Sequence, residues 1–378
     1  MPESKRYTPP SNAALALADG RVFRGRGFGA DTDASGEVVF TTTMTGYQEV
    51  CTDPSFRGQI VCMTYPLIGN YGVNDDDDES RQPWIAGLVV REWSVAPSNW
   101  RSTGTIDAYL KDAGIPGIAG IDTRALTRHI RSVGDTRAVI VHHAQGLPDE
   151  DLIARARVAL LPGEHDVVGE VLDATEQVIG DPDADVHVVV LDCGVKRNII
   201  RSLTRRGVKV TVVPYGTPYS RIADIDPDGV IVSPGPGDPA NLDDGLDVVW
   251  SLLEDERPYF GICLGHQLLA RAIGADTDKL KFGHRGGNQP VIDERTGRVT
   301  ITAQNHSYRV VDGSVPTDTG WQVALRNLND GSVEGLAHDR LPVLSVQFHP
   351  EASPGPVDSN NMFDAFLDLI RDRQSVNS

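Results

Sequence analysis

The segment Tyr259-Phe-Gly-Ile-Cys-Leu-Gly-His-Gln267 decides how the second half of the chain folds. Apolar residues before the cysteine predict a buried strand, and leucines at helical spacing after it predict a helix. Cys263 lies at the junction, with Gly261 and Gly265 two residues away on either side. This spacing is typical of a nucleophile elbow, a turn so tight that larger neighbours would clash. The segment therefore predicts a reactive cysteine raised above the edge of a sheet.

Strands and helices alternate around this turn. Continuous apolar runs predict buried strands at 186–191, 208–213, 229–232 and 258–262. Amphipathic stretches predict helices at 196–206, 246–253 and 264–273. This alternation predicts an α/β fold with right-handed crossovers and a doubly wound parallel sheet. Ligands of such sheets bind at the carboxyl ends of the strands, where each motif below falls.

The first half of the chain is expected to form a separate, β-rich α/β domain. Asp19-Gly20 between two apolar runs predicts a hairpin, and the stretches 38–42 and 123–131 predict a strand and an amphipathic helix. The segment Glu176–Asp185 is polar and contains Gly and Pro, so it is interpreted as a linker. The expected domains are residues 1–180 and 186–378.

The composition argues against several classes of protein. Among 378 residues there are 35 Lys and Arg and 53 Asp and Glu, and the net charge of −18 disfavours nucleic acid and anionic membranes as partners. No apolar run approaches the roughly 20 residues of a membrane span, and no apolar signal segment follows Lys5 and Arg6. The acidic run 75–79 is interpreted as a solvated loop rather than a metal site, because like charges repel without spaced ligands.

The four cysteines differ in what surrounds them. None forms a CxxC pair, which indicates a reducing cytoplasm and argues against disulfides or a metal site. Cys51 and Cys62 are interpreted as packing residues, and Cys193 as structural, because it follows a strand but lacks the paired glycines. A helix N-terminus at Cys263 favours a thiolate, and the N–H group of Leu264 can face a developing oxyanion.

A cysteine nucleophile needs a base, and the base needs an orienting group. The segment His349-Pro-Glu351 supplies both. The proline keeps His349 out of the α conformation, and residues two apart in an extended chain share a face, so Glu351 can orient the imidazole ring. His266 is an alternative base, but it lies in the helix behind the nucleophile and is expected to point away from the substrate.

A third motif, Ser233-Pro-Gly-Pro-Gly-Asp-Pro239, follows the strand predicted at 229–232. Alternating Pro and Gly make the backbone rigid and bare of side chains. Such a loop can present N–H groups to a substrate carbonyl, although an ordinary rigid turn would have the same composition. The chain has no GxxxxGK[ST] loop, so no ATP site is expected in it.

Together the three motifs resemble the class I, triad-type glutamine amidotransferase domain across residues 186–378. The first half resembles the N-terminal domain of the small-subunit family of carbamoyl phosphate synthetases. The stretches that carry this second resemblance are 43–49 (TMTGYQE), 52–55 (TDPS), 64–70 (TYPLIGN) and 120–127 (GIDTRALT). Other amidotransferases with the same glutaminase domain lack that half.

The resemblance implies a role for individual residues. Cys263 would be the nucleophile, His349 the base and Glu351 its orienter, while the amides of Gly235 and Leu264 would hold the oxyanion. The residues implied to bind L-glutamine are Ser55, Gly235, Gly237, Leu264, Gln267, Asn305, Ser307 and Tyr308. Relatives often have Gly-Phe where this chain has Ser307-Tyr308. Because Ser55 belongs to the first half, the site is expected at a domain interface.

The resemblance also implies a cytoplasmic partner, a large synthetase subunit that binds ATP and Mg²⁺. Ammonia from glutamine would reach it through a tunnel and, with bicarbonate and ATP, yield carbamoyl phosphate for arginine and pyrimidine synthesis. The chain itself would need no metal or cofactor. Three alternatives stay open: a glutaminase serving another synthase, such as one acting on chorismate; a cysteine hydrolase of a different substrate; and a non-catalytic docking subunit.

Overall fold

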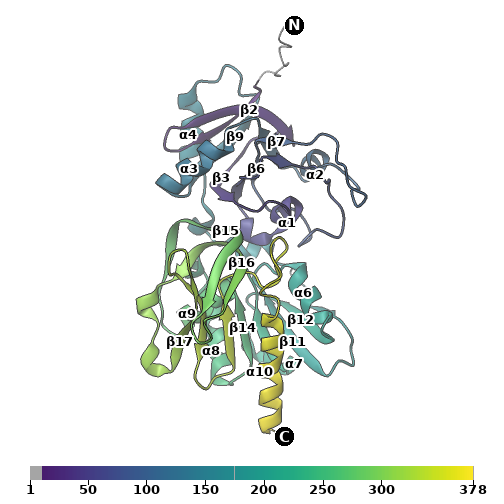
Figure 1. Ribbon diagram of the computed structural model, residues 1–378, viewed down its shortest axis with the longest axis vertical. Coiled ribbons are helices and arrows are strands. Elements are labelled where there is room, and N and C mark those ends of the chain that lie inside the picture. The colour runs from purple at the N-terminus through teal and green to yellow at the C-terminus, as the bar shows by residue number, and fades with distance from the viewer. Residues whose placement is uncertain (1–10, 174, 378) are drawn as a thin grey trace. The chain divides into compact units, whose positions relative to one another are not determined.

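A computed structural model describes residues 11–173 and 175–377, which form two compact units (Figure 1). Unit one comprises the chain up to Thr41, Gly58–Asp76 and Ile85–Leu161. Unit two comprises Thr42–Arg57, Asp77–Trp84 and the chain from Pro162. Two short segments of the first half of the sequence therefore belong to the second unit.

Unit one is built on a closed barrel with the strand order β1-β2-β8-β6-β4-β3-β9. These strands are β1 Ala13–Leu17, β2 Val22–Gly29, β3 Ala34–Thr41, β4 Gln59–Met63, β6 Gly87–Val89, β8 Pro116–Ala119 and β9 Thr136–His142. The helices are α2 Ile106–Asp112, α3 Thr123–Val133 and α4 Asp149–Arg157, and β5 Leu67–Ile68 pairs with β7 Glu92–Trp93. The predicted hairpin joins β1 to β2, the predicted strand lies in β3, and the predicted helix is α3.

Unit two contains a ten-stranded sheet with the order β10-β12-β11-β13-β14-β19-β18-β17-β15-β16. Its parallel part consists of β12 Val208–Pro214, β11 Val186–Asp192, β13 Gly229–Val232, β14 Tyr259–Ile262 and β19 Val343–Val346. The sheet continues in antiparallel fashion through β18 Val333–His338, β17 Trp321–Asn327, β15 Thr277–Asp293 and β16 Val299–Val310. The helices of this unit are α1 Tyr47–Thr52, α5 Val168–Val171, α6 Arg197–Thr204, α7 Tyr219–Ile225, α8 Asp244–Glu254, α9 Leu264–Ala272 and α10 Met362–Asn377.

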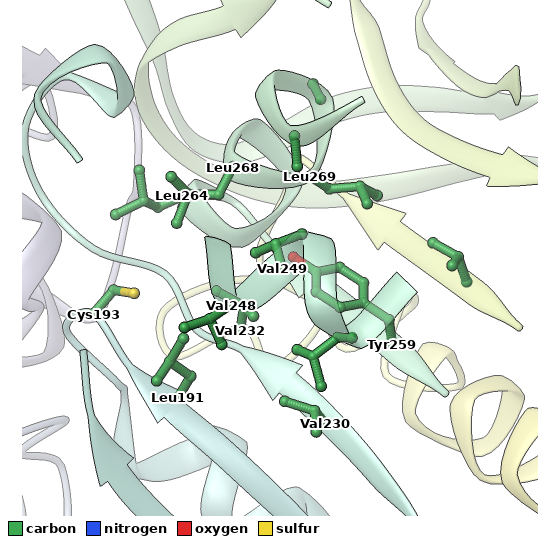
Figure 2. Packing of buried hydrophobic residues seen from close by; sticks show 14 of the residues in the cluster. Leu191, Cys193, Val230, Val232, Val248, Val249, Tyr259, Leu264, Leu268 and Leu269 are labelled. Atoms are coloured by element: carbon green, nitrogen blue, oxygen red, sulfur yellow. The ribbon is translucent and has the colours of Figure 1, made fainter. Parts of the chain in front are cut away.

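Helices cover both faces of the parallel strands. Val189 and Leu191 of β11 pack in one buried cluster with α8 and α9, whereas Val188 and Val190 pack in another with α6 and α10. Figure 2 shows the first cluster, where side chains of α9 meet those of the strands, including Tyr259. Alternate residues of one strand thus face opposite layers, which is the arrangement expected of a strand buried on both sides.

Two interpretations of the sequence are wrong. The stretch Glu176–Asp185 is not only a linker, because it contains β10 Gln177–Ile179, which pairs with β12. The acidic run 75–79 is not a fully solvated loop, because Glu79 is 1% exposed. Glu79 accepts a hydrogen bond from the backbone N–H of Asn198 and lies near Arg201 in unit two. The proposed domain limits of 180 and 186 stay a prediction, but the segment of the compact unit that holds β11 already begins at Pro162.

Membrane insertion was not expected from the sequence. Within residues 11–173 and 175–377, no helix has both the length and the apolar character that a bilayer crossing requires.

Candidate active site

Cys263 lies in a strained turn between β14 and α9. Its backbone has φ 53° and ψ −99°, a conformation that residues other than glycine rarely adopt. The two flanking glycines are sterically required. A Cβ atom at Gly261 would lie 2.7 Å from the carbonyl oxygen of Gly265, and one at Gly265 would lie 2.1 Å from that of Val232. The turn therefore has the geometry predicted for a nucleophile elbow.

His349 and Glu351 form the predicted pair. His349 Nδ1 lies 2.7 Å from Glu351 Oε1, and both side chains are buried. The backbone N–H of His349 donates to the carbonyl of Ala303, which fixes the chain as it leaves β19. Because Nδ1 faces a carboxylate, the pair sets the tautomer and leaves Nε2 for another partner.

The Nε2 atom of His349 is buried and makes no well-formed hydrogen bond within the described residues. The Cys263 thiol is nevertheless close enough to affect the ring. Burial alone would lower the pKa of His349, but the Glu351 carboxylate and the interaction with Cys263 outweigh it and raise the pKa to about 10. A protonated imidazole at this position stabilises negative charge on a neighbouring sulfur.

Lys196 is a member of this site that the sequence did not reveal. It is 2% exposed, and its Nζ lies 3.1 Å from Glu351 Oε1. Burial would raise the pKa of Glu351, but Lys196 and His349 outweigh it and lower the pKa to about 2. Glu79 and Asp53 contribute further negative charge near Lys196. The sequence feature that could have indicated Lys196 is its position just after the carboxyl end of β11, because ligands and catalytic groups gather at that edge of a parallel sheet.

Two polar groups besides His349 lie near the sulfur of Cys263. It lies 3.7 Å from the carbonyl oxygen of Asn305, and Gln347 Nε2 lies 3.6 Å from the sulfur. Gln347 also accepts a hydrogen bond of 3.0 Å from Gln267, whose Nε2 donates to the carbonyl of Tyr308 as well. Asn305 thus contacts the sulfur of Cys263 directly, and Gln347, which was not among the predicted site residues, links Gln267 and Tyr308 to it.

The Pro- and Gly-rich loop lies against the elbow. A Cβ atom at Gly235 would lie 2.2 Å from the carbonyl oxygen of Cys193 and 2.8 Å from the Leu264 side chain. Gly235 and Leu264, the two residues implied for the oxyanion, are therefore neighbours. Gly237 has φ +92° and faces Val167 instead, so its implied role in binding glutamine stays a prediction. Cys193 is buried in the core, which raises its pKa and agrees with a structural role.

Ser55 and Asn305 are brought together through Asp53. Asp53 Oδ1 accepts from the backbone N–H of Ser55 at 2.9 Å, and Asp53 Oδ2 accepts from Asn305 Nδ2 at 3.0 Å. The hydroxyl oxygen of Ser55 is buried without a hydrogen-bond partner in the described part of the chain. Because residues 42–57 belong to unit two, the site does not need a boundary between compact units, contrary to expectation.

Ser307, an implied glutamine contact, and His266, the alternative base, both have other partners. Ser307 Oγ accepts a short hydrogen bond from Arg285, and the alternative base His266 is bound to Ser345 at 2.9 Å. Burial lowers the pKa of His266 to about 3, so this ring is neutral and already engaged. The buried polar atoms Ser55 Oγ and His349 Nε2, which have no hydrogen-bond partner among the described residues, are available to a polar ligand.

Two family models match the chain. One describes the carbamoyl-phosphate synthase small chain, CPSase domain, and matches residues 15–140; the other describes class-I glutamine amidotransferases and matches residues 189–369. Curated relatives match along almost the whole length of both chains. The carbamoyl phosphate synthase small chain of Syntrophotalea carbinolica is 50% identical over 379 residues, covering 96% of this chain and 99% of the relative.

Two further relatives match over a similar share of the chain. The carbamoyl phosphate synthase small chain of Archaeoglobus fulgidus is 48% identical, with 95% of this chain and 99% of the relative covered. The carbamoyl phosphate synthase pyrimidine-specific small chain of Halalkalibacterium halodurans is 49% identical, with 94% and 96% covered.

Proposed function

Because the chain belongs to the family of carbamoyl phosphate synthase small chains, we propose that it hydrolyses L-glutamine to glutamate and ammonia. The ammonia passes to a large synthetase subunit in the cytoplasm. That subunit binds ATP and Mg²⁺ and makes carbamoyl phosphate from bicarbonate for arginine and pyrimidine synthesis. The observation that carries the proposal is the strained, buried Cys263 next to a histidine that a carboxylate orients.

The reaction begins with attack of the Cys263 sulfur on the side-chain amide carbon of glutamine. The carbonyl oxygen becomes an oxyanion, which the N–H groups of Gly235 and Leu264 stabilise, each by about 3–4 kcal/mol. His349 then gives a proton to the leaving nitrogen, and ammonia departs from a glutamyl thioester. Water that His349 deprotonates hydrolyses the thioester, which releases glutamate and restores the thiol.

The remaining residues of the site orient the histidine or bind the substrate. Glu351, held by Lys196, keeps the His349 ring in the tautomer that presents Nε2 to the reacting atoms. The Ser55 hydroxyl, which has no hydrogen-bond partner within residues 11–173 and 175–377, and the side chains of Gln267 and Asn305 are suited to the polar groups of an amino acid. Ser307 and Tyr308 adjoin this set in β16.

The test uses the chain co-purified with the large subunit. Carbamoyl phosphate formation is measured once with glutamine and once with ammonium ion as the nitrogen source. Cys263→Ser should abolish synthesis from glutamine and leave synthesis from ammonium intact, because only the release of ammonia needs the thiolate. Cys51→Ser, at another buried cysteine of unit two, is the matched control and should retain both activities.

Each other outcome has a definite meaning. Normal glutamine hydrolysis by the Cys263→Ser variant would refute the assigned nucleophile. A wild-type complex that uses ammonium but never glutamine would indicate a non-catalytic docking subunit. Failure to associate with the large subunit, together with free glutaminase activity, would point to a different synthase as the partner.

A further inference from the structure

A buried polar cluster adjoins the nucleophile but has no part in the mechanism above. It contains His284 of β15, Gln304 and His306 of β16, and Glu334 of β18. Their exposed fractions are 8%, 4%, 5% and 0%. Buried polar atoms need complementary partners, so the positions of the protons in this cluster can be worked out from the contacts.

The contacts of His306 cannot all be satisfied by the groups as they stand. Its Nδ1 lies 2.7 Å from the carbonyl oxygen of Tyr308, which only accepts hydrogen bonds, so Nδ1 must carry a proton. Its Nε2 lies 3.0 Å from Gln304 Oε1, a second acceptor. A neutral imidazole has only one N–H group and would therefore direct a lone pair at an oxygen.

Two arrangements remove this conflict. In the first, His306 is a cation and Glu334 a carboxylate. In the second, the amide of Gln304 is turned over, so that its nitrogen donates to His306 Nε2 and its oxygen faces Glu334, whose Oε2 lies 2.9 Å from the amide. Glu334 must then be protonated to donate to that oxygen. Either way the cluster holds one proton more than a neutral histidine and a carboxylate would.

Burial favours the second arrangement. Separated charges at two fully buried positions are costly, whereas a neutral histidine and a carboxylic acid are not. Burial likewise lowers the pKa of His306 well below its usual range and raises the pKa of Glu334 to about 7. Arg285 and His349 add positive charge near His306, which opposes a further cation there.

The other groups that face Glu334 do not resolve the conflict between His306 and Gln304. Asn327 Nδ2 donates to Oε1 at 3.0 Å, and His284 Nδ1, 3.8 Å from Oε1, is buried without a hydrogen-bond partner in the described part of the chain. His284 Nε2 faces the Asp330 carboxylate at 3.1 Å and so carries a proton of its own. A second proton on His284 would pair with Glu334 but would leave the conflict between His306 and Gln304 unresolved.

We propose that Glu334 is a buried carboxylic acid which, through the Gln304 amide and the His306 ring, positions the backbone carbonyl of Tyr308. That carbonyl also accepts a hydrogen bond of 2.9 Å from Gln267, which is linked through Gln347 to the sulfur of Cys263. Glu334 is thus a positioning residue for the glutamine site, an inference that rests on the proposed function.

Loss of the Glu334 proton would reverse the direction of the hydrogen bonds that run from Glu334 through Gln304 and His306 to the Tyr308 carbonyl. An ionised Glu334 attracts the nitrogen of Gln304, which turns the amide oxygen back towards His306 Nε2. The ring then moves its proton from Nδ1 to Nε2 and releases the Tyr308 carbonyl. If only the protonated form binds glutamine well, the apparent KM rises as the inverse of the protonated fraction, towards about tenfold per pH unit above the pKa.

The first measurement is the KM for glutamine against pH in the complex with the large subunit. Glu334→Gln keeps the shape and a donor for Gln304 but cannot ionise, so its KM should stay low where that of the wild type rises, while kcat changes little. Glu37→Gln is the matched control, because Glu37 is 2% exposed in unit one and is likewise bound to a glutamine amide, that of Gln59. A Glu334→Gln profile that follows the wild type overturns the proposal.

The second measurement is made on the wild-type protein, so it depends neither on activity nor on the folding of Glu334→Gln. Nitrogen NMR of the histidine-labelled wild-type protein, with His306→Asn to assign the signal, should show a neutral ring protonated at Nδ1 at pH 6. A doubly protonated His306, or the Nε2–H form at that pH, overturns the proposal. If glutamine were not the substrate, the KM experiment would fail altogether while this signal would persist, so the two failures can be told apart.

Discussion

Lys196 provides a stringent test of the buried charges, because it can be changed without altering the predicted catalytic residues. Its Nζ lies 3.1 Å from Glu351 Oε1 and also donates to the carbonyl oxygen of Ala352. In Lys196→Met the apolar stem is largely preserved, but the charge and its donors are lost. The carboxylate of Glu351 then remains in the interior with His349 to balance its charge.

The size of the effect follows from the geometry. At an effective dielectric constant of about 20, two unit charges at the observed 3.1 Å attract by roughly 5 kcal/mol. Desolvation of the lysine offsets part of this attraction in the wild type. Removal of one partner from a buried pair typically costs about 3–5 kcal/mol, since the other charge is left uncompensated. We therefore expect the free energy of unfolding of unit two to fall by about 3–5 kcal/mol.

A second substitution separates charge from packing. Glu79 is 1% exposed and is a further negative group near Lys196, and burial raises its pKa to about 7 despite the attraction of the lysine. In a Lys196→Met background, Glu79→Gln removes a buried carboxylate that has lost the charge of Lys196 and keeps Arg201, at 3.6 Å, as a half-buried counter-charge. The double variant should be more stable than Lys196→Met alone, and the cycle gives the coupling between the two sites directly.

Urea unfolding followed by tryptophan fluorescence measures these changes, because Trp84 and Trp321 are buried in unit two. The midpoint should move to lower urea at an unchanged slope. Lys209→Met, at a partly buried position of β12, is the matched control and should shift the midpoint by much less. A loss under about 1 kcal/mol for Lys196→Met, or a double variant less stable than the single one, would refute the reasoning.

Three further substitutions test separate parts of the site. Glu351→Gln should lower kcat/KM for glutamine by about 10²–10⁴-fold, because without the carboxylate burial lowers the pKa of His349. The pH profile of alkylation of the Cys263 thiol reports the same change. Gly265→Ala should give unfolded protein by circular dichroism, since its Cβ would lie 2.1 Å from the Val232 oxygen, whereas Gly313→Ala meets nothing within 4 Å and should fold normally. Ser55→Ala removes a buried hydroxyl that has no hydrogen-bond partner among the described residues, so the melting temperature should hold while the KM for glutamine rises by about tenfold. Equal KM values would contradict a role in binding.

Local patterns were sufficient where the interacting residues are close in sequence. The elbow depends on Gly261, Cys263 and Gly265, and the steric contacts of the two glycines explain why this spacing is required. The orientation of Glu351 towards His349 follows from two-residue periodicity in an extended chain, and the observed 2.7 Å contact agrees with it. These features could be predicted because backbone geometry alone fixes them.

Contacts between distant segments could not be predicted in this way. Lys196 reads as an ordinary polar residue at the start of a helix, and Glu79 as one more member of an acidic run. Their burial depends on where the chain folds back, which neither periodicity nor composition encodes. The antiparallel strands β15 to β18 were likewise not predicted, because long strands with register shifts carry no clean alternation of apolar and polar residues.

The unit that holds the glutamine amidotransferase domain also contains segments from the first half of the sequence. Asp53 and Glu79 both come from that half, yet they pack in unit two, where they lie near Asn305 and Lys196. Removing these segments would leave a buried lysine with fewer counter-charges and a buried amide without its carboxylate, each of which is costly. Residues 186–378 therefore contain the proposed reacting groups but not all of the charges that hold them, and the boundary predicted from sequence composition divides one electrostatic network in two.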